Sequence, residues 1–123
     1  MPDLPKLVGK EIVLELGAPA APDDDPIRLT CPWTVEANHD FAALLSLDRD
    51  EDGQVFFRVP QARARDLQDV MLASITAHNI TDGEKSLKGD IRAILLERLA
   101  PLDLVLLRQQ FARKVLNLRE AGN

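Results

Sequence analysis

The sequence predicts an α+β fold, with an N-terminal antiparallel sheet of about four strands followed by three C-terminal helices packed on it. Before residue 60, apolar residues alternate with polar ones, as in strands with one buried face, whereas after it they recur at helical spacing. The charge divides at the same point: residues 1–60 carry five Lys and Arg against twelve Asp and Glu, and residues 61–123 carry ten against eight. A length of 123 residues predicts one domain, with a mainly β, acidic first part and a mainly α second part.

Alternation typical of strands is clearest in residues 10–16 and 27–36. Pro32 lies on the polar face of the second segment and removes one backbone donor. This strand is therefore expected to lie at a sheet edge, to bulge or to end early. Between the two strands, residues 17–26 are acidic and rich in proline, and we expect them to form an exposed loop.

A second pair of strands is expected around an acidic turn. Residues 38–47 mix helical and strand features, because Asn38 would cap a short helix, while the end of the segment is interpreted as a strand. Residues 48–53 (DRDEDG) form a polar turn with a glycine, and residues 54–59 (QVFFRV) are β-branched and aromatic. Together these segments predict a hairpin.

Helical spacing begins after residue 60. Apolar residues trace one face of a first helix over residues 61–78. Thr81 and Glu84 have the spacing of a capping box, which predicts the start of a second helix. Pro101 is tolerated in the first turn of a new helix, and we expect the last helix over residues 101–118.

The last helix carries the candidate partner-binding residues. Its apolar positions are spaced 3, 4, 4 and 3 residues apart, as in a coiled-coil seam: Leu104, Leu107, Phe111, Val115 and Leu118. Four more apolar residues fall outside this stripe and must also be covered: Leu102, Val105, Leu106 and Leu116. We expect a protein partner or a second copy to contact this seam. If it does, Leu107→Glu or Val115→Glu should abolish association and leave the monomer folded.

Composition argues against several partners. The net charge of −5 disfavours a protein that grips phosphate backbones, and a nucleic-acid regulator would need one basic face built from Arg63, Arg65, Arg92 and Arg98. No stretch approaches 18 consecutive apolar residues, and the N-terminus has no basic and apolar segments typical of a signal peptide. We therefore expect a cytoplasmic protein without nucleic-acid or membrane partners.

Metal-binding and cofactor motifs are weak. Asp48, Asp50, Asp52 and Gly53 match the first half of an EF-hand loop, but its twelfth position is Val59, which favours an acidic turn. Residues 23–25 are three adjacent aspartates, which are expected to stay solvated. No third ligand is spaced with either histidine, and nucleotide-binding glycine motifs are absent, so no metal and no cofactor is expected.

Two function classes remain. The first is a non-enzymatic protein–protein interaction module, a small assembly factor or structural subunit of a larger complex. The opposite charges of its halves favour head-to-tail association. In length and layout, the last two helices (LERLAPLDLVLLRQQFARKVL) resemble those of small tail-assembly chaperones of phages and phage-like particles. The alternative is a small enzyme or ligand-binding domain with an acid/base site around His39 and Asp40.

Overall fold

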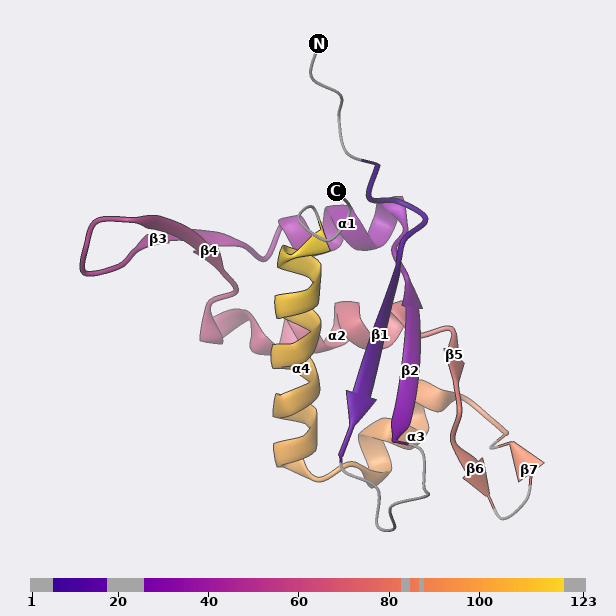
Figure 1. Cartoon of the computed structure of the whole chain (residues 1–123). Coiled ribbons are helices and arrows are strands. Elements are labelled where there is room, and N and C mark those ends of the chain that lie inside the picture. Colours follow the sequence, from indigo (N-terminus) through magenta and orange to yellow (C-terminus); the bar gives the residue numbers. More distant parts are fainter. Residues whose placement is uncertain (1–5, 18–25, 83–84, 87, 119–123) are drawn as a thin grey trace.

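Antiparallel strands and α-helices make up the computed structural model, which confirms the predicted α+β class (Figure 1). The structure describes four stretches of the chain, which are residues 6–17, 26–82, 85–86 and 88–118. Residues 23–25, expected in an exposed loop, lie outside these stretches.

The main sheet has three strands. β1 (Glu11–Leu16) pairs antiparallel with β2 (Ile27–Pro32), and β2 pairs antiparallel with β5 (Ala77–His78). Residues directly opposite each other in an antiparallel pair share a face, and Leu14 lies opposite Leu29. Both side chains are fully buried, so this face of the sheet forms one wall of the core.

The second strand ends at Pro32, before residue 36. A helix follows, although the alternation of apolar and polar residues through residue 36 is typical of a strand. α1 (Val35–Ala42) begins after Thr34, whose hydroxyl accepts a hydrogen bond from the N–H of Ala37. The early end expected at Pro32 is therefore confirmed, whereas the alternative of an edge strand is wrong, because β2 lies between β1 and β5. Thr34, and not Asn38, caps the helix; Asn38 lies inside it.

The expected hairpin is present, but it does not extend the main sheet. β3 (Ser46–Arg49) and β4 (Val55–Arg58) pair only with each other, as a separate two-stranded ribbon that projects from the body (Figure 1). The strand expected at the end of residues 38–47 is confirmed. A single sheet of about four strands is replaced by three strands plus this ribbon.

The first predicted helix is shorter than residues 61–78. A 3-10 turn, η1 (Gln61–Arg63), leads into α2 (Ala64–Ser74), and the chain then becomes extended at Ile75. The N–H of Thr76 donates to the carbonyl oxygen of Thr30, which starts the pairing with β2. Ala77 and His78, expected at the end of the helix, thus belong to the sheet.

The predicted capping box is also wrong. Thr81 lies in the short strand β6 (Thr81–Asp82), which pairs with β7 (Lys85–Ser86), and Glu84 is outside the described residues. The second helix, α3 (Ile91–Arg98), starts later, where the carboxylate of Asp90 accepts a hydrogen bond from the N–H of Arg92.

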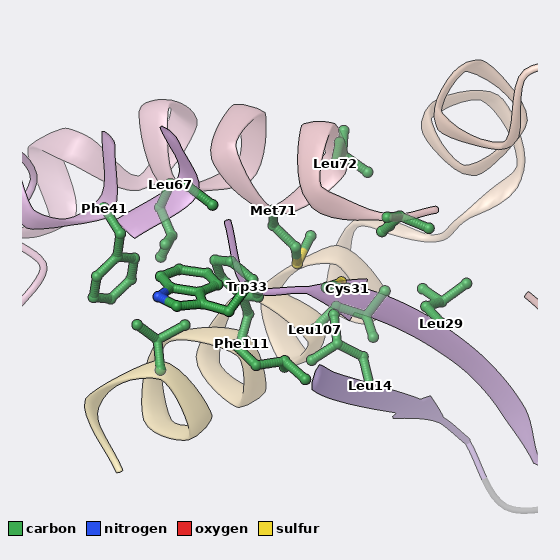
Figure 2. Packing of buried hydrophobic residues seen from close by; sticks show 14 of the residues in the cluster. Leu14, Leu29, Cys31, Trp33, Phe41, Leu67, Met71, Leu72, Leu107 and Phe111 are labelled. Atoms are coloured by element: carbon green, nitrogen blue, oxygen red, sulfur yellow. The ribbon is translucent and has the colours of Figure 1, made fainter. Parts of the chain in front are cut away.

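The last helix, α4 (Pro101–Leu116), begins with its proline in the first turn, as predicted. It packs on β1 and on α2, and brings Phe111 to the centre of the core. Figure 2 shows Phe111 close to Trp33, and both rings also lie about 6 Å from Phe41: the centroid distances are 5.9 Å, 6.1 Å and 6.0 Å. These edge-on and tilted contacts stabilise the junction of sheet, α1 and α4.

Helix α4 also closes the outer edge of β1. The N–H of Glu15 donates to Oε1 of Gln110 at 2.7 Å, and Nε2 of Gln110 donates to the carbonyl oxygen of Glu15 at 3.0 Å. The ammonium group of Lys114 donates to the carbonyl oxygen of Val13. The side-chain amide of Gln110 thus takes the place of a peptide group in a neighbouring strand, and blocks addition of a strand at this point.

Candidate interaction surface

The five residues predicted to bind a partner lie in the interior of the folded chain. Leu107 and Phe111 are almost completely buried, Val115 and Leu118 are buried, and Leu104 is half-buried. They pack against the sheet and α2, whose buried residues belong to the same hydrophobic core. The seam is therefore a core seam, and the expectation that it forms the contact surface is corrected.

The apolar residues outside the seam are the exposed ones. Leu102 is 67% exposed and Leu106 is 48% exposed; Leu116 is also exposed and Val105 is half-buried. At 100° per residue, these four positions lie on the side of α4 opposite Phe111. We call Leu102, Leu106 and Leu116 the α4 ridge. The wide apolar arc predicted from the sequence is thus real, but only its inner half is covered.

A second exposed apolar surface lies on the β3–β4 hairpin. Leu47 and Phe57 are about three-fifths exposed, at 60% and 58%, and Val55 and Phe56 are exposed as well. Leu47 lies directly opposite Phe57, so the two side chains share a face with Val55, while Phe56 faces the other way. Both faces of the ribbon therefore present a large apolar side chain to solvent.

The hairpin is well defined despite its exposure. The carboxylate of Asp50 accepts hydrogen bonds from the N–H groups of Asp52 and Gln54, both at 2.9 Å, and Gly53 adopts a φ of +81° that closes the turn. Asp48 accepts a hydrogen bond from the guanidinium of Arg58 at 2.8 Å. The EF-hand-like carboxylates Asp48 and Asp50 are thus engaged by the hairpin itself.

The hairpin is joined to the body at its base. Leu45 and Val59, which flank the two strands, are partly buried against the core, whereas β3 and β4 make no extensive contact with another described element. Beside the base lies a surface hollow of about 370 Å³, which Arg58 and Gln61 line from one side and Val105 and Arg108 from α4. The hairpin and α4 therefore adjoin each other at one corner of the molecule.

The residues of the alternative acid/base site lie on one short helix. His39 and Asp40 are both exposed on α1. Asp40 lines a hollow of about 210 Å³ together with Glu36 and Ser74, but His39 is not among its lining residues. Asp48 lies on the hairpin, in its ion pair with Arg58. Two carboxylates of α1 thus share a hollow that no histidine enters.

The remaining candidate groups are held by local contacts. Cys31 is fully buried in β2, and this burial raises the pKa of its thiol to about 12. Arg63 forms an ion pair with Asp66 at 3.4 Å, and Arg92 forms one with Asp90 at 3.7 Å. These two arginines lie on different elements, each next to a carboxylate.

Comparison with known proteins gives no relative from which a function can be transferred. No protein-family model matches the chain, and neither the search of curated proteins nor the search of solved structures finds a significant match. Among the described residues, no helix has the length and apolar character needed to cross a membrane.

A signal for the hairpin surface was present in the sequence. In a strand, successive side chains point to opposite faces, so Val55, Phe56 and Phe57 cannot all face one core. Either both faces of this strand are covered, or one of its apolar side chains is exposed. The polar residues of the preceding turn gave no indication of which alternative holds.

Proposed function

We propose that this protein is a non-enzymatic protein–protein interaction module, a small assembly factor or structural subunit of a larger complex. Its contact surface is the β3–β4 hairpin together with the α4 ridge. The proposed contact residues are therefore not the buried seam of α4. They are the exposed residues on the other side of that helix and on the neighbouring ribbon.

The observation that carries this proposal is the exposure of four large apolar side chains on a projecting two-stranded ribbon: Leu47, Val55, Phe56 and Phe57. An isolated two-stranded hairpin is only marginally stable in water, and a cluster of exposed apolar residues marks an interaction site. Burial of such side chains stabilises a complex by about 25 cal/mol for each Å² of apolar surface removed from water. A partner that covers the ribbon would stabilise both the complex and the hairpin.

The test is site-specific photo-crosslinking in the native host. A photoreactive amino acid, p-benzoylphenylalanine, replaces Phe57 in one variant and Val35 in a control variant. Val35 is 68% exposed on α1, away from the hairpin, so it reports contacts of an exposed apolar residue that belongs to neither surface. We expect a discrete protein adduct from position 57 and none from position 35.

The adduct is identified by mass spectrometry after purification under denaturing conditions, which removes non-covalent contaminants. Failure of position 57 to form any adduct, or equal yields from both positions, contradicts the proposed surface. Trp33 fluorescence confirms in each variant that the core is intact, because this single tryptophan of the chain is buried between Phe41 and Phe111.

A further inference from the structure

We infer that the partner of this surface is a second copy of the chain, with the hairpin of one copy against the α4 ridge of the next. This inference deepens the proposed function and rests on it. The two surfaces differ, so each contact joins the hairpin of one copy to the ridge of another, and every copy carries one hairpin and one ridge.

Charge complementarity supports this occupant. The hairpin, residues 46–58, carries four carboxylates and two arginines, and three of the carboxylates are at its tip. Helix α4 carries one carboxylate, Asp103, and three cations, of which Arg108 donates to Gln68 and Lys114 donates to Val13, so that Arg113 is the cation on the ridge side of the helix. The acidic tip of the ribbon and the exposed Arg113 attract each other, whereas hairpin against hairpin would place like charges together.

The spacing of apolar and charged groups also matches. Along the ribbon, Leu47 is four residues from Glu51 at the tip, or about 13 Å at about 3.3 Å per residue. On α4, Arg113 follows Leu106 by seven residues and Leu102 by eleven, or about 10 Å and about 17 Å at 1.5 Å per residue. A hairpin whose apolar residues lie on the leucines therefore brings its tip to Arg113, which is exposed.

Both surfaces are exposed in the part of the chain that the structure describes. Leu102 and Leu106 are exposed on α4, and Leu47 and Phe57 are exposed on the ribbon, so a contact between hairpin and ridge covers the most exposed apolar side chains of each. Strand addition at β1 offers no competing contact at Glu15, where Gln110 occupies the backbone groups.

Two double variants test the inference by complementation. The hairpin variant carries Leu47→Ser and Phe57→Ser, and the helix variant carries Leu102→Ser and Leu106→Ser. All four residues are exposed, so urea unfolding monitored by Trp33 fluorescence should show native folds. Val35→Ser is the matched control. Sedimentation velocity and native mass spectrometry follow association from about 1 µM to about 100 µM, a range that covers weak to moderate affinity.

We expect the wild type and Val35→Ser to form species larger than a monomer, and each double variant to be monomeric. An equimolar mixture of the two variants should form a heterodimer and nothing larger, because it retains only one productive pair of surfaces. A wild type that stays monomeric throughout overturns the inference, as does association that survives both double substitutions. Monomeric variants that fail to associate when mixed overturn it as well, since like surfaces would then be meeting.

Charge reversal in the mixture adds a second test. Glu51→Lys in the helix variant, or Arg113→Glu in the hairpin variant, should each weaken the heterodimer by about tenfold, and the two together should restore affinity. Independent, additive losses would contradict the proposed orientation.

The crosslinking experiment separates this inference from the proposed function. An adduct of position 57 with another protein, in a chain that is monomeric alone, would overturn self-association and leave the interaction module standing. Absence of both adduct and association would remove both.

Discussion

Two adjacent leucines of helix α4 distinguish its core side from its exposed side. Leu107 is 1% exposed and Leu106 is 48% exposed, although both are leucines at neighbouring positions in the same helix. Replacing each with alanine leaves helix propensity almost unchanged and removes the same atoms. Any difference in the free energy of unfolding between Leu107→Ala and Leu106→Ala therefore measures how much of each side chain the core contacts.

Leu107→Ala should lower the free energy of unfolding by about 3 to 5 kcal/mol, because it removes buried methyl groups and leaves a cavity. Leu106→Ala should lower it by about 1 kcal/mol or less, since half of that residue is already in contact with water. Leu107→Glu should prevent folding, because an unpaired carboxylate in the core costs a large part of the roughly 5 to 15 kcal/mol that stabilises a domain. This outcome replaces the expectation of a folded monomer.

The assay is urea unfolding at low micromolar concentration, where self-association contributes least, with Trp33 fluorescence and far-UV circular dichroism as paired probes. A loss of 3 kcal/mol shifts the midpoint by about 1 M or more for an m-value of about 1 to 3 kcal/mol/M. Equal shifts for the two alanine variants, or a soluble and folded Leu107→Glu monomer, would refute the assignment of Leu107 to the core.

Three further changes test other parts of the structure. Gln110→Ala removes both hydrogen bonds to Glu15 and should cost about 1 to 3 kcal/mol, with faster hydrogen exchange of the Glu15 amide detected by NMR. The pKa of Cys31, raised to about 12 by burial, predicts a thiol that resists iodoacetamide at pH 8 until the protein is denatured. Above about pH 9 the unfolded thiol loses its proton before the folded one does. The free energy of unfolding should then fall by about 1.4 kcal/mol per pH unit more than in Cys31→Ala. Thr34→Ala removes the N-cap of α1 and should cost about 1 kcal/mol in thermal unfolding.

The elements that sequence periodicity predicted well are those whose structure is determined by local signals. β1 lies within residues 10–16, β3 and β4 flank a turn closed by Asp50 and Gly53, and α4 begins at the expected proline. In each case, the alternation or spacing of apolar residues coincides with a local start or stop signal.

The errors arose where tertiary contacts end an element. Ile75 and His78 continue the helical spacing of α2, and residues 75–82 include no glycine or proline to stop it. The helix ends because the N–H of Thr76 pairs with Thr30, a partner 46 residues earlier in the chain. Local periodicity carries no information about such a partner, so the short strand β5 was assigned to the helix.

The candidate site failed for a related reason. Spacing showed that α4 has a wide apolar arc, but it could not show which part of the arc the sheet and α2 would cover. The more regular part, with Leu107 and Phe111, was taken as the partner surface and is the core. The less regular part is exposed, because the sheet and α2 pack against the opposite side of the helix.

The contacts that close the edge of β1 also constrain how the chain folds during synthesis. Gln110 and Lys114 lie 95 and 101 residues after the strand positions they cover, so β1 and β2 leave the ribosome long before α4 exists. Until then, the backbone groups of Glu15 are unpaired and available to other nascent chains. The protein therefore depends on its last helix for more than stability: any chain interrupted before residue 110 exposes a strand edge that the finished molecule hides.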